Sequence, residues 1–161
     1  MKIIQLIEED FVNYKRPAFY VGFPTCSFKC DTDCGRRVCQ NRPLITAKKI
    51  EVEFDRLIEK YLGNSITKAI VCGGLEPLDS MQDLKDMILA FRKKTDDDIV
   101  VYTGYYEYEP LALEFISFVK EYNVSNILAK FGRYVPDQKN HFDDIIGVWL
   151  ASDKQHGVKI S

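Results

Sequence analysis

The sequence predicts an α/β protein with a mostly parallel, open sheet. Short apolar stretches typical of buried strands alternate with amphipathic stretches typical of helices, at intervals of 25–50 residues. Such alternation indicates right-handed βαβ units. Hydrophobic residues make up 46% of the 161 residues, enough to form a core. A chain of this length predicts one domain spanning residues 1–161.

Four apolar runs are the predicted strands, and a fifth run is a candidate. In chain order they are Ala18–Phe23, Lys68–Cys72, Ile99–Tyr102, Asn126–Lys130 and the candidate Ile145–Leu150. The segment Met1–Arg16 precedes the first strand and is compatible with either a short helix or an edge strand.

Three helices are predicted between the strands. The first runs from a cap at Thr46 to Tyr61, because its apolar residues recur at helical spacing. The second opens at Ser80, which forms a capping-box pattern with Asp83, and reaches about Lys94. The third begins at Pro110, a residue favoured in the first turn, and ends near Tyr122.

Charge and hydropathy exclude some classes of protein. The 22 basic and 24 acidic residues give a net charge of −2, which offers no bulk electrostatic attraction for nucleic acid. No apolar run approaches the ~20 residues that cross a bilayer. The N-terminal sequence MKIIQLIEEDF turns acidic and lacks the apolar core of a signal peptide. We therefore expect a cytoplasmic protein that binds neither nucleic acid nor membrane.

Four of the five cysteines fall within 14 residues, in the sequence TCSFKCDTDCGRRVCQNRP. They are Cys26, Cys30, Cys34 and Cys39; Cys72 stands alone at a strand end and is expected in the core. In a reducing compartment, clustered thiols favour metal binding or redox chemistry over disulfides. The cluster has no C-x-x-C pair and no histidine, which argues against a zinc ribbon. The spacing leaves open a Cys₄ zinc site, unliganded thiols, or three thiolates on an iron–sulfur cluster.

Unusual residues follow each predicted strand. The cysteine loop follows the first strand, Gly73-Gly74-Leu75-Glu76-Pro77 the second, Thr103-Gly104-Tyr105 the third and Phe131-Gly132-Arg133 the fourth. Parallel sheets bind ligands beyond the carboxyl ends of their strands. Paired glycines let the backbone approach a ligand, and a carboxylate accepts hydrogen bonds from an ammonium group. Each loop alone is also compatible with an ordinary turn, but together they predict a binding site at one edge of the sheet.

A cysteine loop followed by a Gly-Gly-Leu-Glu-Pro loop resembles the radical S-adenosylmethionine (radical SAM) superfamily. Cys39-Gln40-Asn41, Tyr102-Thr103-Gly104-Tyr105 and Phe131-Gly132-Arg133 are similar to the anaerobic ribonucleotide reductase activating proteins. The resemblance extends from about Tyr20 to Arg133 and implies a partial (β/α) barrel.

Two features depart from the superfamily pattern. Its usual spacing is C-x₃-C-x₂-C, and here only Cys26-x₃-Cys30 fits. The Cys39-Gln40-Asn41 context assigns the third ligand to Cys39, so that Asp31–Val38 becomes an insertion carrying Cys34. The second departure is Leu75, which shifts Glu76 by one position.

The resemblance implies the cofactors, the site residues and the partners. Cys26, Cys30 and Cys39 would hold a [4Fe–4S] cluster; Gly73, Gly74 and Glu76 would contact the methionine part of S-adenosylmethionine; Thr103, Gly104 and Tyr105 would lie near its ribose or adenine. The implied enzyme is an oxidoreductase that cleaves S-adenosylmethionine reductively to a 5′-deoxyadenosyl radical. This radical would install a glycyl radical on a partner enzyme such as anaerobic ribonucleotide reductase. A reductant such as flavodoxin or ferredoxin would supply the electron, and no side chain is expected to act as a general acid or base.

Three alternatives remain open from the sequence. The chain is also compatible with a radical SAM enzyme that acts on a small molecule or peptide. An iron–sulfur electron carrier would use both Cys34 and Cys39, because it needs four ligands. A zinc-stabilised binding module is the third alternative.

Overall fold

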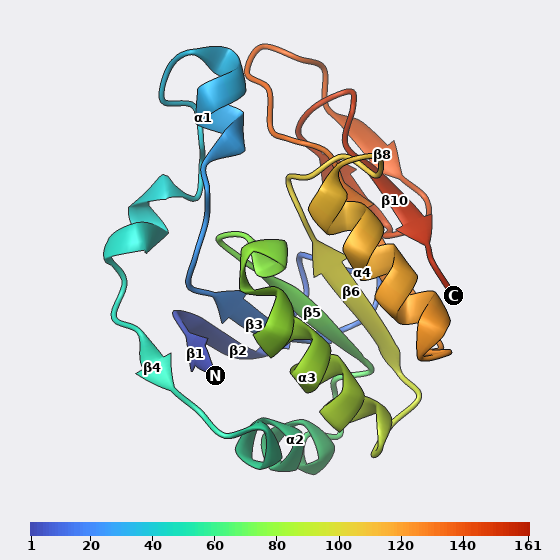
Figure 1. The fold of residues 1–161 in the computed structure, drawn as a ribbon. Coiled ribbons are helices and arrows are strands. Elements are labelled where there is room, and N and C mark those ends of the chain that lie inside the picture. The colour runs from blue at the N-terminus through green and yellow to red at the C-terminus, as the bar shows by residue number, and fades with distance from the viewer.

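The computed structural model describes residues 1–161 and has a six-stranded central sheet with order β10-β7-β6-β5-β3-β2 (Figure 1). The strands are β2 (Gln5–Asp10), β3 (Ala18–Phe23), β5 (Ala69–Gly74), β6 (Asp98–Tyr102), β7 (Ile127–Phe131) and β10 (His156–Lys159). The four inner strands are parallel, and each edge strand is antiparallel to its neighbour. The prediction of an α/β fold with a mostly parallel open sheet is confirmed. The sheet has two free edges and does not close into a barrel.

The four predicted strands match β3, β5, β6 and β7 to within two residues at each end. Their residues are almost all buried, as expected for parallel strands that are covered on both faces. The N-terminal segment contains two strands, β1 (Lys2–Ile3) and β2, so the edge-strand alternative is the correct one for this part of the chain.

The predicted strand Ile145–Leu150 is wrong in extent and in position. Only Val148–Leu150 is extended, as β9, and it pairs with β8 (His141–Asp143) in a separate hairpin. The carboxylate of Asp143 accepts hydrogen bonds from the backbone N–H groups of Ile145 and Ile146 at 3.0 and 2.8 Å. These bonds stabilise a turn where a continuous strand was expected.

Two of the three predicted helices have nearly the predicted bounds, α3 (Met81–Arg92) and α4 (Pro110–Glu121). The first predicted helix is wrong at its start, because α2 (Phe54–Gly63) begins eight residues after Thr46. Thr46 instead ends the 3₁₀ helix η1 (Arg42–Thr46), and β4 (Ile50–Glu51) then pairs with β1. Pairing between segments far apart in sequence overrides the helical pattern here.

Ser80 precedes α3 but makes no capping hydrogen bond with its side chain. The 3₁₀ helix η2 (Pro77–Ser80) leads into α3, and the Ser80 hydroxyl lies 2.5 Å from the Thr25 hydroxyl. The predicted capping box is therefore wrong, since this serine contacts the segment that leaves β3. A short helix within the cysteine segment, α1 (Lys29–Cys34), lies apart from α2, α3 and α4 in Figure 1.

Alternation along the inner strands divides the sheet into two faces. Phe19, Ile70, Ile99 and their neighbours face α2–α4 and belong to a main core of 25 buried residues. The opposite face carries a smaller cluster of seven buried residues, including Ala18 and Val100. None of the helices combines the length and the apolar composition that crossing a bilayer requires.

Candidate functional site

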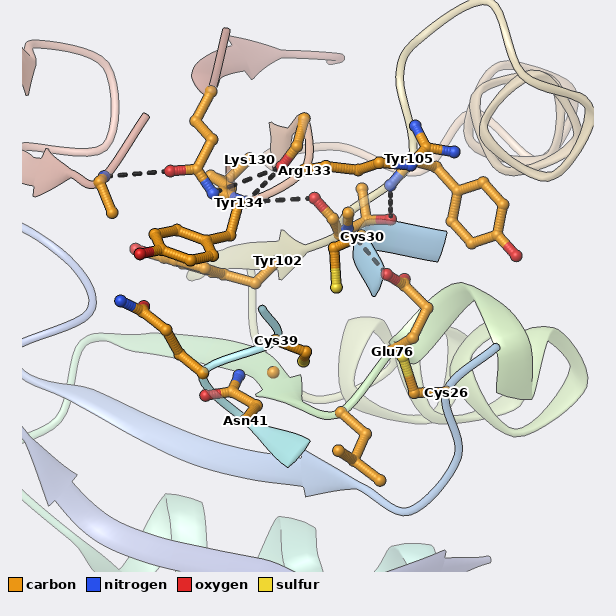
Figure 2. Close-up of a pocket in the computed structure, with 18 of the residues that line it drawn as sticks. Cys26, Cys30, Cys39, Asn41, Glu76, Tyr102, Tyr105, Lys130, Arg133 and Tyr134 are labelled. Atoms are coloured by element: carbon orange, nitrogen blue, oxygen red, sulfur yellow. Dashed lines mark hydrogen bonds between the residues drawn. The ribbon is translucent and has the colours of Figure 1, made fainter. Parts of the chain in front are cut away.

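A cavity of about 330 Å³ lies where the four parallel strands end. This volume is within the usual range of small-molecule sites, about 300–1,000 Å³. The structure brings all nine predicted site residues to the wall of this cavity: Cys26, Cys30, Cys39, Gly73, Gly74, Glu76, Thr103, Gly104 and Tyr105. Figure 2 shows the three cysteines, Glu76 and Tyr105 among the residues around it. The rule that ligands bind beyond the carboxyl ends of parallel strands therefore locates a real cavity.

The three predicted cluster ligands all line this cavity. Cys26 lies in the loop after β3, Cys30 is on α1, and Cys39 follows the turn after α1. Burial raises the pKa of Cys26 and of Cys30 to about 12. Nearby negative charge adds to both shifts, from Glu76 and Cys39 at Cys26 and from Cys39 at Cys30. Cysteine thiolates are soft ligands that repel one another when they are close. A bound metal centre with positive charge offsets this repulsion.

The other two cysteines lie elsewhere. Cys34, at the end of α1, does not line the cavity. Cys72 is fully buried on β5 within the main core, so its prediction as a core residue is confirmed. No three Cys, His, Asp or Glu side chains are grouped closely enough to coordinate a single metal ion.

Other parts of the chain approach both loop glycines closely: a side chain at Gly73 and the backbone at Gly74. A Cβ atom at Gly73 would lie 2.7 Å from the Tyr20 hydroxyl. Gly74 has φ of +86°, and a Cβ there would lie 2.8 Å from the backbone of both Gly22 and Phe23. The Gly74 carbonyl accepts a hydrogen bond from the Asn41 side chain at 2.7 Å, which joins the glycine loop to the cysteine segment. The glycine loop therefore presents backbone, without side chains, to the cavity.

Glu76 connects the loops after β5 and β6. Its side chain is 5% exposed, and its carboxylate accepts hydrogen bonds from Gly104 N–H at 2.7 Å and Leu78 N–H at 3.1 Å. Burial raises the pKa of this carboxyl to about 7, although these hydrogen bonds oppose the shift. Two of its lone pairs are thus engaged within the protein, and its contact with a ligand ammonium group stays a prediction.

Tyr105 is a wall of the cavity and not an exposed aromatic residue. Its side chain is buried, and its hydroxyl donates to Asp79 at 2.5 Å. Its backbone N–H donates to the Thr103 hydroxyl at 3.0 Å, which shapes the turn after β6. Tyr105 is therefore not available to dock a partner, whereas Tyr108 and Trp149 are exposed.

Lys130 is a functional candidate that the sequence reasoning missed. It lies on β7, faces the cavity and is 7% exposed. Its ammonium donates to the carbonyls of Gly132 at 2.8 Å and Thr103 at 3.3 Å, and it has no salt-bridge partner. Burial lowers its pKa to about 8. The sequence feature that points to it is a lysine within the otherwise apolar strand ILAKF, where a charged residue is unusual.

Arg133 has a structural partner of its own. Its guanidinium makes two hydrogen bonds with the Glu109 carboxylate, at 2.6 and 2.8 Å, and its Nε lies 2.9 Å from Asp33 on α1. Burial would raise the pKa of Glu109, but the Arg133 hydrogen bonds outweigh it and the pKa falls to about 2. Lys29 also reaches Glu109 at 3.2 Å. These contacts attach α1 to the carboxyl edge of the sheet.

Comparison with known proteins adds no family assignment. No protein-family model matches the chain, and no curated protein sequence matches it significantly.

Proposed function

We propose that this chain is an iron–sulfur protein of the radical SAM kind, which cleaves S-adenosylmethionine reductively. One observation carries the proposal: three thiols, a bare glycine loop, a buried carboxyl group and a buried ammonium group line the same cavity. This donor set suits a cluster bound by three cysteines next to a ligand that carries an amino acid group. Interpretation of the open sheet as a partial (β/α) barrel belongs to the same proposal.

Cys26, Cys30 and Cys39 are the proposed ligands of a [4Fe–4S] cluster. When bound, such a cluster supplies the single electron that breaks a carbon–sulfur bond of S-adenosylmethionine. Three protein thiolates leave one of the four irons without a cysteine. The electron-carrier alternative needs a fourth thiolate, and Cys34 lies outside the cavity.

The buried charged groups fit the methionine part of the ligand. A zwitterionic amino acid needs an acceptor for its ammonium group and a donor for its carboxylate. Glu76 offers the acceptor, and Lys130, which lacks a carboxylate partner in the protein, offers the donor. Gly73 and Gly74 line the cavity without side chains, so the ligand can approach the backbone there. The residues of the cavity thus orient the ligand, and none of them needs to transfer a proton.

The proposed partners follow from the resemblance to the anaerobic ribonucleotide reductase activating proteins. A reductant such as flavodoxin or ferredoxin supplies the electron, and the substrate is a glycine of a glycyl radical enzyme such as anaerobic ribonucleotide reductase. Two exposed aromatic residues lie near the site. Trp149 lines the cavity, and Tyr108 follows the loop after β6 in the sequence. Exposed aromatic residues of this kind are common at protein interfaces.

Anaerobic reconstitution with iron and sulfide tests the proposed activity. The loaded protein is incubated with dithionite and S-adenosylmethionine, and 5′-deoxyadenosine and methionine are quantified. We expect both products in equal amounts, and none with the Cys30→Ser variant or without dithionite. Stoichiometric zinc without iron, or an iron-loaded protein that leaves S-adenosylmethionine intact under these conditions, would contradict the proposal.

A further inference from the structure

The insertion between the second and third proposed ligands creates a geometric problem. Eight residues separate Cys30 from Cys39, yet both thiols reach the same cavity. The chain must therefore turn back on itself. Gly35 follows the last residue of helix α1, and its φ of +62° and its N–H hydrogen bond to the Thr32 carbonyl begin this reversal. The end of a six-residue helix does not by itself determine where Cys39 lies.

The carboxylate of Asp31 closes the loop. One oxygen, Oδ1, accepts hydrogen bonds from the backbone N–H groups of Val38 and Cys39, both at 2.7 Å. The other oxygen, Oδ2, accepts from Arg42 through both Nε, at 2.9 Å, and Nη2. The Asp31 side chain is only 10% exposed. A single side chain, adjacent to Cys30 in sequence, thus holds three later groups of the same segment.

Two further contacts fix the far end of the segment. The Arg42 guanidinium lies over the Phe28 ring, 4.3 Å from its centroid, so it bridges the start and the end of the loop. Asn41 donates to the Gly74 carbonyl, which anchors the residue two positions after Cys39 to the glycine loop. The backbone on both sides of Cys39 is therefore held by side chains.

We propose that Asp31 is a positioning residue that holds the Cys39 thiol beside Cys30, so that the insertion still delivers a third thiolate to the cavity. The role of this thiolate as a cluster ligand rests on the proposed function. The closure of the loop by Asp31 does not, and it is testable on metal-free protein. A charge-assisted pair of N–H bonds and a two-point arginine contact make a carboxylate the suitable group at this position.

The first test measures thiol proximity without any metal. Metal-free protein carrying Cys34→Ala is oxidised with glutathione disulfide, and peptide mapping follows the Cys30–Cys39 disulfide. In this reaction the two thiols lose two protons and two electrons, and glutathione disulfide is reduced to two glutathione thiols. Hydrogen bonds to a charged group contribute about 1.5–3 kcal/mol, so Asp31→Ala should slow this disulfide by about 10- to 100-fold.

Two variants separate positioning from general damage to the fold. Asp31→Asn keeps an oxygen that can accept the Val38 and Cys39 N–H groups, so it should restore part of the lost rate. Asp55→Ala removes an exposed carboxylate in the first turn of α2, outside the cysteine segment, and should leave the rate within about twofold. Equal rates for Asp31→Ala and the parent, or an equal loss with Asp55→Ala, would overturn the proposal.

The second test adds iron and sulfide to the same variants. Asp31→Ala should bind less iron and give a weaker or altered paramagnetic signal after reduction, with partial recovery in Asp31→Asn. If all forms fail to assemble a cluster while the disulfide rates still differ, the proposed function is wrong and the positioning role of Asp31 stands. If the parent assembles a cluster and Asp31→Ala does so equally well with the same signal, the positioning role is wrong.

Discussion

Replacing Gly74 by alanine should destabilise the protein strongly, and the structure gives the size of the effect. Alanine at the observed φ of +86° costs about 1–2 kcal/mol, because its Cβ crowds the backbone in this region. The new Cβ would also lie 2.8 Å from backbone atoms of Gly22 and Phe23, which no side-chain rotation can relieve. Overpacking of this kind costs about 1–3 kcal/mol. The free energy of unfolding should therefore fall by about 2–5 kcal/mol.

Urea unfolding of the metal-free protein measures this change, with Gly63→Ala as the matched control. Gly63 is the last residue of α2, and nothing lies within 4 Å of a Cβ built there. The same substitution at Gly63 should be neutral or stabilise the protein by up to about 1 kcal/mol, because alanine favours a helix. Equal unfolding midpoints for the two variants would refute the assignment of Gly74 to a constrained turn.

Three further predictions concern buried polar and sulfur groups. The pKa of Glu76 is about 7 in the folded protein and near 4.5 in the unfolded chain. The contribution of this group to the free energy of unfolding is therefore full below pH 4.5 and is lost as the pH rises through 7. The loss is on the order of 2–4 kcal/mol. Glu76→Gln should remove that part of the pH dependence in urea titrations at pH 5 and 8, and an unchanged slope would contradict the burial argument. Lys130→Met should weaken S-adenosylmethionine binding to the cluster-loaded protein by about 10- to 100-fold in calorimetry, since a charged hydrogen bond is lost, while metal-free stability stays equal or rises; unchanged affinity would exclude Lys130 as the carboxylate donor. Cys72→Ser should lower the free energy of unfolding by about 1–3 kcal/mol, because it buries a hydroxyl group in the core, without changing iron content, and loss of iron would contradict its placement.

The sequence predicts the inner sheet well because the signal there is local. Each parallel strand is a short apolar run that is buried on both faces, and its bounds can be recognised from neighbouring residues alone. The candidate residues stand in the loops that directly follow these strands. Since the carboxyl ends of parallel strands meet at one edge of the sheet, the sequence predicts that these nine residues surround one cavity. Burial of Cys72 follows from its position in the same kind of run.

Other features depend on partners that are distant in sequence. Helix α2 begins at Phe54 because Ile50 pairs with Ile3, and no local pattern records that pairing. Arg133 is buried rather than solvated because Glu109 and Asp33 meet it from other segments. The position of Lys130 is likewise not predictable from its neighbours in the sequence, since it depends on which face of β7 borders the cavity.

The central claim is that Cys26, Cys30 and Cys39 form a three-thiolate site from which Cys34 is excluded. Iron bound per chain after anaerobic reconstitution tests it most directly, with Cys34→Ala and Cys39→Ala compared side by side. We predict about four irons per chain for Cys34→Ala, as in the parent, and almost none for Cys39→Ala. Loss of iron in Cys34→Ala with retention in Cys39→Ala would contradict the account.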